Sequence, residues 1–197
     1  MNKTIAFFDF DGTITTKDSL LEFIRFVKGD AAFYFGFILH SPVLVLYKLQ
    51  IVSNQFAKEM MLRYFFGKMD VNVFNNHCED FIKKKIPSLI RPKALHEIKT
   101  LQNGGAKVVV VSASPENWLN AWCSSVGTDC IATRLVIDNN RITGKIDGRN
   151  CHGEEKVNRI RSRYNLNDFS SVYAYGDTPA DRHMLSLANI RFYKPFL

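Results

Sequence analysis

Three short runs of apolar residues along the chain predict buried β-strands. They are continuous rather than alternating, and each ends abruptly in polar residues. The runs are residues 5–8, 107–111 and 171–175. Strands that are apolar on both faces are typical of a parallel sheet covered by helices on both sides.

Helical patterns lie between the second and third of these runs. Residues 115–125 open with a proline, which favours the first turn of a helix, and Ser114 is the expected N-cap. Residues 154–164 place their apolar side chains on one helical face. Strands that alternate with helices predict an α/β fold with a Rossmann-like, doubly wound parallel sheet, in which ligands bind at the carboxyl ends of the strands.

The segment 134–145 between these two helices is typical of a β-hairpin. Asp138, Asn139 and Asn140 separate two β-branched runs, and such residues tolerate the backbone of a tight turn. We expect this hairpin to be a peripheral flap.

Residues 17–90 contain several helix signals and no clear strand. Asp18 marks a capped helix start, residues 54–66 end at a glycine, and Asp70 precedes another amphipathic segment. An ordinary connection between a strand and a helix has about 2–6 residues, so this insertion predicts an all-helical cap domain. The predicted domains are a catalytic core of residues 1–16 and 91–197 and a cap of residues 17–90.

Within that insertion, residues 31–47 carry no charge. A membrane-spanning helix needs roughly 20 apolar residues, and Pro42 is expected to break this stretch, with Ser41 capping a second short helix. The stretch is apolar around its whole helical wheel, which leaves two interpretations. One is a helix pair buried in the cap, which the usual burial of apolar residues favours. The other is a surface that enters a membrane or receives a lipid chain.

Composition narrows the choice of partners. The 197 residues are 46% hydrophobic, which is normal for a globular protein. The formal net charge is +7, but the basic residues are scattered apart from one short run at residues 83–85. No nucleic-acid-binding module is recognisable, so we expect no nucleic-acid partner and instead a smaller anionic one, such as a phosphate ester, or an anionic membrane surface.

The cysteines and the N-terminus bear on localisation. The four cysteines form no C-x-x-C pair and no zinc-binding spacing, which is typical of reduced thiols in a cytoplasmic protein. The apolar run before Asp9 is too short for a signal peptide. We expect a cytoplasmic protein, with peripheral contact at the inner face of a membrane if the apolar stretch binds lipid.

Each predicted strand ends in side chains suited to phosphate chemistry. If the strands are neighbours, four carboxylates meet in one crevice, and two carboxylates about 5 Å apart repel by roughly 3 kcal/mol at an effective dielectric constant of about 20. Such a cluster predicts a bound cation, and all-oxygen ligands suit Mg²⁺. The residues are Asp9, Asp11, Gly12 and Thr13 after the first strand, Ser112 and Ala113 after the second, and Asp177 and Asp181 after the third.

These residue types suit phosphoryl transfer. A carboxylate beside Mg²⁺ can attack phosphorus and form an aspartyl-phosphate. The second aspartate, two residues further on, can protonate the leaving alcohol and activate water. Lys156, at a predicted helix start, can neutralise the oxygens of the transferring group.

Together the motifs resemble those of haloacid dehalogenase-superfamily hydrolases. D-F-D-G-T at residues 9–13 resembles the first motif, Ser112 in V-S-A-S the second, Lys156 the third and G-D-T-P-A-D at residues 176–181 the fourth. The inserted segment resembles the helical cap of the phosphoserine-phosphatase-like branch. The resemblance covers the whole chain.

The resemblance implies roles for individual residues. It makes Asp9 the nucleophile and Asp11 the general acid/base, with the backbone carbonyl of Asp11 on the metal. Dehalogenases and phosphonate-cleaving members lack the second aspartate, so Asp11 implies a phosphatase. The implied phosphate-binding residues are Gly12, Thr13, Ser112, Ala113 and Lys156, and the implied Mg²⁺ ligands are Asp9, Asp11, Asp177 and Asp181.

The substrate leaves alternatives open. In phosphoserine phosphatases a cap acid shortly after the first motif reads the substrate amine, and Asp18 stands near that place, where a helix N-cap is equally expected. The apolar stretch and C-H-G-E-E-K at residues 151–156 instead resemble bacterial phosphatidylglycerophosphate phosphatases, whose lipid substrate would suit a basic protein. A membrane-peripheral binding protein with a vestigial enzyme site is a third interpretation.

Further candidates for substrate contact come from outside the four motifs. His152, close to Lys156 in the chain, could reach the phosphate. The cap cations that could meet the substrate are Arg25, Lys48 and Arg63.

Overall fold

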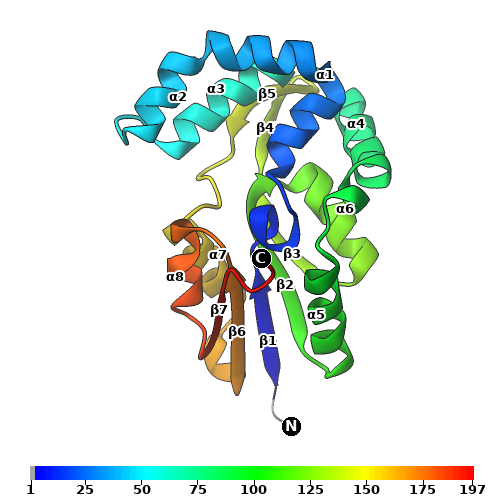
Figure 1. Ribbon diagram of the computed structural model, residues 1–197, viewed down its shortest axis with the longest axis vertical. Coiled ribbons are helices and arrows are strands. Elements are labelled where there is room, and N and C mark those ends of the chain that lie inside the picture. The colour runs from blue at the N-terminus through cyan, green and yellow to red at the C-terminus, as the bar shows by residue number, and fades with distance from the viewer. Residues whose placement is uncertain (1–2) are drawn as a thin grey trace.

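Five parallel strands form the central sheet of the computed structural model, which describes residues 3–197 (Figure 1). The three predicted strands are adjacent, with Ile5 paired to Lys107 on one side and to Val172 on the other. The expected doubly wound α/β fold is therefore confirmed. In their order across the sheet the strands are β3 (Asp129–Thr133), β2 (Lys107–Pro115), β1 (Thr4–Phe8), β6 (Ser171–Gly176) and β7 (Ile190–Tyr193).

The continuous apolar runs contribute side chains to two separate hydrophobic cores, because successive side chains of a strand point to opposite faces of the sheet. Ala6 and Phe8 of β1 belong to the core beneath α5 (Pro92–Asn103) and α6 (Glu116–Val126). Ile5 and Phe7 belong to the core beneath α7 (Glu154–Arg163) and α8 (Arg182–Leu185). Figure 1 shows these two helix pairs on opposite faces of the sheet.

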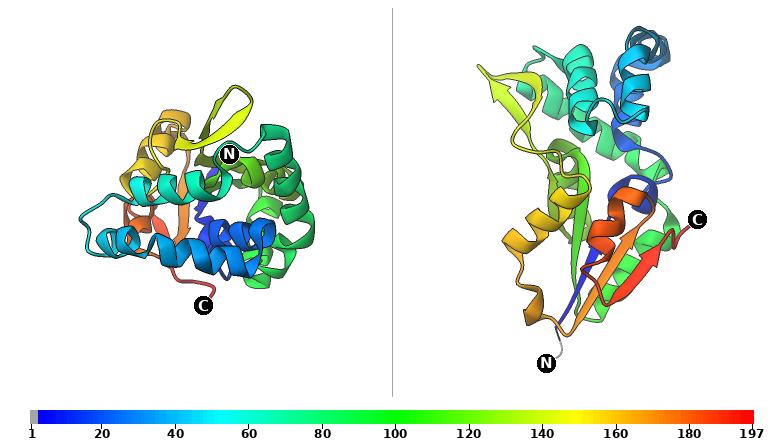
Figure 2. Two further views of the ribbon diagram at one scale, coloured as in Figure 1. Left: turned by 90° about the horizontal axis from the view of Figure 1, so that it is seen from above. Right: turned by 90° about the vertical axis from the view of Figure 1, so that its left-hand side faces the viewer.

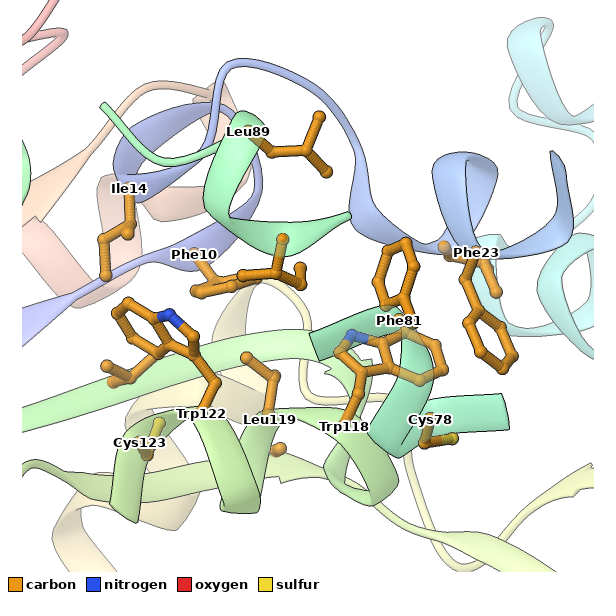
Figure 3. Close-up of a cluster of buried hydrophobic side chains, with 14 of the residues drawn as sticks. Phe10, Ile14, Phe23, Cys78, Phe81, Leu89, Trp118, Leu119, Trp122 and Cys123 are labelled. Atoms are coloured by element: carbon orange, nitrogen blue, oxygen red, sulfur yellow. The ribbon is translucent and has the colours of Figure 1, made fainter. Parts of the chain in front are cut away.

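Four helices lie beyond the carboxyl ends of the strands (Figures 1 and 2). They pack on α6 through aromatic side chains such as Phe23, whose ring lies 4.7 Å from that of Trp118 (Figure 3). Phe10, in the turn after β1, packs on the same helix, with its ring 5.0 Å from that of Trp122. The helices are α1 (Ser19–Leu39), α2 (Ser41–Lys48), α3 (Asn54–Phe66) and α4 (Val71–Lys84). Short 3₁₀ turns occupy Ile86–Ser88, Leu166–Asp168 and Pro179–Asp181.

The helix starts follow the capping signals with two exceptions, Ser41 at the start of α2 and Ser114 at the start of α6. Asp18 accepts a hydrogen bond from the backbone N–H of Leu21, and Asp70 caps α4 in the same way. Ser41, expected as a cap, is instead the first residue of α2, and its hydroxyl donates to the carbonyl of Ile38. The chain bends by 64° between α1 and α2 next to Pro42. No single helix of the described residues is long and apolar enough to cross a membrane, although α1 and α2 taken as a bent pair meet that criterion by length and composition.

The apolar stretch 31–47 is largely exposed, so the favoured prediction of a buried helix pair is wrong. Phe33 and Gly36 are buried against the cap, but Phe35 is 63% and Ile38 is 72% exposed. The reason is the layering of the cap. The end of α1 and all of α2 form an outer layer that α3 covers on one side only (Figure 1).

The predicted hairpin forms as a two-stranded sheet of its own, separate from the central sheet. Its strands β4 (Leu135–Asp138) and β5 (Arg141–Ile146) turn through two asparagines with positive φ. The backbone N–H of Ile146 donates to Glu59 of α3, and the carbonyl of Ile142 accepts from the N–H of Lys68. Strands from outside the helical insertion therefore pack on α3.

The four cysteines are free thiols.

Candidate active site

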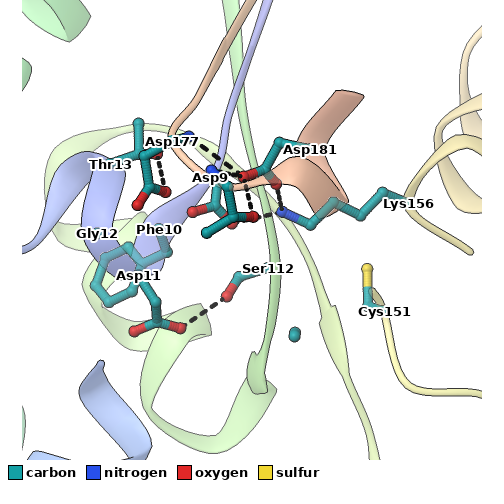
Figure 4. Close-up of polar contacts among 12 residues, drawn as sticks. Asp9, Phe10, Asp11, Gly12, Thr13, Ser112, Cys151, Lys156, Asp177 and Asp181 are labelled. Atoms are coloured by element: carbon teal, nitrogen blue, oxygen red, sulfur yellow. Dashed lines mark hydrogen bonds and ion pairs between the residues drawn. The ribbon is translucent and has the colours of Figure 1, made fainter. Parts of the chain in front are cut away.

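The carboxyl ends of β1, β2 and β6 bring the predicted site residues to one edge of the sheet (Figure 4). After β1 the chain makes an irregular helical turn at Phe10–Ile14, in which Gly12 has a φ of +90°. A Cβ at Gly12 would overlap the carboxylate of Asp177. Glycine is therefore required here both by the backbone conformation and by the close approach of the last motif.

Three carboxylates form a cluster at this edge. Ligand oxygens of Asp9, Asp177 and Asp181 lie within 4.8 Å of one another. Asp9 and Asp181 are buried, and Asp177 is half-buried. The Nζ of Lys156, at the start of α7, donates to Asp9 Oδ1 at 2.5 Å and to Asp181 Oδ1 at 2.7 Å.

The charges of this cluster do not balance. Burial raises the pKa of Asp9 to about 8, although Lys156 opposes the shift, and burial also raises the pKa of Asp177. Burial acts to lower the pKa of Lys156, but Asp9 and Asp181 outweigh it and keep the ammonium charged. Three carboxylates share one ammonium, so full ionisation of the cluster needs a further cation. The all-oxygen donor set fits Mg²⁺.

The partners of these carboxylates differ. Asp181 Oδ1 pairs with Lys156, while its Oδ2 accepts from the N–H groups of Asp177 and Thr178 and from the Thr178 hydroxyl. Both of its oxygens are thus occupied by the protein. Asp177 has fewer partners: the hydroxyl of Thr13 donates to its Oδ1 at 2.9 Å. The Thr13 side chain therefore lies on Asp177.

Asp11 lies apart from the cluster (Figure 4). Its Oδ1 accepts from the N–H of Ser19 at 2.7 Å, and its Oδ2 accepts from the hydroxyls of Ser114 at 2.6 Å and Ser112 at 3.3 Å. Of the expected metal ligands it is the one whose side chain is not with the others, so only its backbone carbonyl could serve in that role.

Ser114 and Ser19 are partners of Asp11 that the sequence analysis did not assign. Ser114 was expected to cap the next helix, but β2 continues through Pro115 and the helix begins at Glu116. The proline cannot donate a backbone hydrogen bond, and the Ser114 hydroxyl turns to Asp11 instead. The second serine of V-S-A-S was the feature of the sequence that could have pointed to Ser114 as a partner of Asp11.

A cavity of about 320 Å³ opens above these residues. Its floor is polar and includes Asp9, Asp11 and Lys156. Its walls come from the cap and are largely apolar, with side chains from three helices. These are Leu20, Leu21, Ile24 and Phe37 of α1, Leu44 and Tyr47 of α2, and Ala57 and Met61 of α3.

The charged groups in the cavity wall agree only in part with those expected. Asp18 and His152, both candidates from the sequence, line the cavity, and so does Lys58 of α3, which was not a candidate. The three cap cations singled out from the sequence do not, and one of them, Arg25, pairs with Glu22 instead. Lys58 was not predicted because a single lysine on an amphipathic helix carries no sequence signal that its side chain reaches the site.

The fold and this site define a class of protein. The family model for haloacid dehalogenase-like hydrolases matches residues 6–186, and the chain belongs to that family. Protein CicA of Caulobacter vibrioides is 36% identical over 191 residues, which are 96% of this chain and 85% of that protein. A probable phosphatase of Mycobacterium tuberculosis is 27% identical over 189 residues, covering 93% of this chain and 66% of that protein.

Solved structures share the fold. A protein of unknown function from Bordetella pertussis superposes with a TM-score of 0.86 at 21% identity, covering 98% of this chain and 90% of that one. A phospho-aspartyl intermediate analogue of phosphoserine phosphatase gives a TM-score of 0.64 at 22% identity, covering 98% and 87%. The predicted superfamily, its phosphoserine-phosphatase-like fold and the phosphatase class of enzyme are confirmed.

Proposed function

We propose that this chain is a Mg²⁺-dependent phosphomonoester hydrolase that works through a phosphoaspartate on Asp9. The observation that carries the proposal is the buried cluster of Asp9, Asp177 and Asp181 around Lys156, with its excess of negative charge, on the floor of a cavity. A structural ion-pair cluster has at least as many cations as carboxylates. An excess of buried carboxylates suits a bound metal ion, which in turn can bind an anionic substrate.

The proposed metal ligands are the carboxylates of Asp9 and Asp177 and the backbone carbonyl of Asp11, with Asp181 beside them. When bound, Mg²⁺ would supply positive charge that stabilises the transferring phosphoryl group. Lys156, whose ammonium already lies on Asp9, would share that task. The remaining proposed phosphate contacts are Ser112 and the backbone N–H groups of Gly12, Thr13 and Ala113.

The proposed reaction has two displacements. Asp9 Oδ attacks phosphorus, the bond from phosphorus to the alcohol oxygen breaks, and Asp11 gives its proton to that oxygen. A water then loses its proton to Asp11 and attacks the phosphoaspartate, which releases inorganic phosphate and restores Asp9. Asp11 borders the cavity, where both proton transfers would take place.

Hydrolysis of an aryl phosphate tests this proposal. We expect turnover that a chelator abolishes and that added Mg²⁺ restores. Asp9→Asn should be inactive because an amide is a poor nucleophile. Asp138→Asn makes the same change at an exposed position in the hairpin and is the matched control. Turnover in the Asp9→Asn variant would contradict the assigned nucleophile, and metal-dependent turnover in the native chain would exclude a vestigial site.

We propose that residues 17–90 act as the cap over a core of residues 1–16 and 91–197. The structure suggests one addition, since the hairpin of β4 and β5 is hydrogen-bonded to α3 and to the chain after it. The hairpin would therefore move with the cap.

The proposed substrate is a phosphomonoester with an apolar portion, such as the head group of phosphatidylglycerophosphate. The apolar cap wall directly above the carboxylates supports it, because a small charged ester gains little from that surface. A soluble ester of the phosphoserine type is the second candidate. It is favoured by Asp18, which lines the same cavity and could bind an amine.

The exposed apolar surface of the cap supports contact with a lipid bilayer. Six side chains from α1, α2 and the residues just after α2 form this surface, which we call the α1–α2 patch. They are 55–72% exposed, and α1 and α2 also line the cavity. We propose a cytoplasmic protein that touches the anionic inner face of a membrane here, helped by its net charge of +7. The residues are Phe35, Ile38, Leu39, Val45, Leu49 and Ile51.

A substrate and vesicle comparison tests both points. We expect phosphatidylglycerophosphate or lysophosphatidate to be hydrolysed faster than phosphoserine, and the protein to sediment with anionic vesicles. Ile38→Glu should weaken sedimentation while leaving aryl phosphate turnover unchanged. Ile137→Glu, at a half-exposed site in the hairpin, is the control. A preference for soluble esters without vesicle binding would contradict the lipid substrate.

A further inference from the structure

Lys58 of α3 joins the cap to the end of β2. Its Nζ donates to the backbone carbonyl of Ala113 at 2.5 Å and to Asn150 Oδ1 at 3.4 Å. The lysine is half-buried and lines the cavity. Burial lowers the pKa of its ammonium, which Asp18 and Asp11 counteract.

The bond to Ala113 fixes one peptide group next to the site. The carbonyl of the peptide between Ala113 and Ser114 accepts from Lys58, and its N–H donates to the hydroxyl oxygen of Ser112 at 2.9 Å. The hydroxyls of Ser112 and Ser114 in turn donate to Asp11. The direction of this peptide therefore sets where both serines hold Asp11.

The bond to Asn150 reaches a second segment of the site. Asn150 is buried, and its Oδ1 also accepts from the Thr133 hydroxyl at 2.9 Å. Its Nδ2 donates to Asn54 and its backbone N–H donates to Gln55, both of α3. Six residues further on, the chain has entered α7 and carries Lys156 into the carboxylate cluster.

One face of α3 thus binds two segments that meet the phosphoryl group from different sides. We propose that Lys58 is a positioning residue for phosphoryl transfer, holding the Ser112–Ser114 segment and the segment leading to Lys156 in fixed relation. The inference rests on the proposed function. Because two of its three N–H donors bind protein oxygens, Lys58 acts through these segments rather than by reading the charge of the alcohol.

The test is steady-state turnover of an aryl phosphate, a substrate with no second charged group for a lysine to read. Lys58→Met keeps the length of the side chain and removes the donors. We expect kcat to fall about 10- to 100-fold, the range of a modest misplacement of reacting groups, with KM little changed. Lys83→Met, at an exposed lysine of the same cap, should match the native chain.

A second variant keeps the test informative if Lys58→Met does not fold. Lys58→Gln retains a donor and should recover part of the loss. Asn150→Ala combined with Lys58→Met should cost less than the sum of the single changes, because each single change already removes the contact between Lys58 and Asn150. Native kcat in a folded Lys58→Met variant, or an effect on KM alone, would overturn the proposal.

The outcomes also separate this inference from the proposed function. Native turnover with an indifferent Lys58 removes only the positioning role. A native chain that neither hydrolyses aryl phosphate nor binds inorganic phosphate in a calorimetric titration removes the proposed function, and the role of Lys58 with it.

Discussion

Two groups of buried charge in this molecule have opposite balances. At the sheet edge, Asp9, Asp177 and Asp181 share the single ammonium of Lys156. In the cap, the buried carboxylate of Glu22 meets three cations, at 3.5 Å, 3.6 Å and 3.0 Å, one of which also pairs with the exposed Asp30. Those cations are Lys17, Arg25 and Lys85.

The balance decides how each carboxylate titrates. Burial acts to raise the pKa of both Asp9 and Glu22. At Asp9 the effect of burial exceeds that of Lys156, and the pKa rises to about 8. At Glu22 the surrounding cations outweigh burial, and the pKa is lowered. A buried carboxylate that is surrounded by cations has its charge compensated by the protein itself. A buried group of carboxylates with too few cations has uncompensated negative charge, which a bound cation can neutralise.

The largest effect is expected from reducing the negative charge of the site. Asp177→Asn keeps the size of the side chain and the acceptor for Thr13 but removes one charge. We expect Mg²⁺ affinity and turnover at limiting Mg²⁺ to fall at least about 100-fold, since the change affects a proposed direct ligand. Isothermal titration and activity against Mg²⁺ concentration measure this. Excess Mg²⁺ should recover part of the turnover, and an unchanged Mg²⁺ dependence would count against the site.

A smaller effect is expected from filling the site. Mg²⁺ at about 100 times its dissociation constant should raise the free energy of unfolding by about 2.7 kcal/mol, because it binds the folded state alone. Thermal or urea unfolding with and without Mg²⁺ measures this. Glu22→Gln should keep that stabilisation, whereas Asp177→Asn should lose it at the same Mg²⁺ concentration. If Mg²⁺ stabilised both variants equally, the site of Mg²⁺ binding would not be the carboxylate cluster, and the two charge groups would not differ as described.

The smallest effect concerns the cap group and depends on pH. The pKa of Glu22 is lowered from its usual 4.5 on folding, so its ionised form favours the folded state. Its contribution is fully present above that value and is lost as the pH falls through it toward the lowered folded value. We expect Glu22→Gln to lower the free energy of unfolding by about 1–2 kcal/mol near neutral pH.

Urea unfolding at several pH values checks this last expectation. The difference between the native chain and Glu22→Gln should shrink as the pH falls below about 4.5. Glu79→Gln changes an exposed partner of Lys83 and should cost little at any pH. A difference that is independent of pH would show that Glu22 acts through packing rather than charge.

Much of the floor of the candidate site could be predicted from the sequence. The buried strands, the residues at their carboxyl ends and the helix that begins before Lys156 were all assigned in the right order, and the structure brings Asp9, Ser112 and Asp177 to one edge. Local patterns suffice there, because a parallel strand delivers whatever follows it to the same edge of the sheet.

The cap was harder to predict. The apolar stretch 31–47 was expected to be buried and lies mostly exposed. The hairpin was expected as a peripheral flap, but its contact with α3 was not foreseen. Lys58 was passed over in favour of Arg25, Lys48 and Arg63, none of which lines the cavity. Helical periodicity shows which residues share a face, but not which neighbour that face will meet.

The sequence by itself determined which side chains form the floor of the candidate site. Asp9, Asp11, Lys156 and Asp177 are placed by short motifs at the ends of regular elements, whose geometry is fixed locally. Only the tertiary structure decided what surrounds them: the pairing of Lys58 with Ala113, the release of Asp11 from the carboxylate cluster, and the exposure of α1 and α2. These depend on contacts between segments far apart in the chain, whose packing no local pattern encodes.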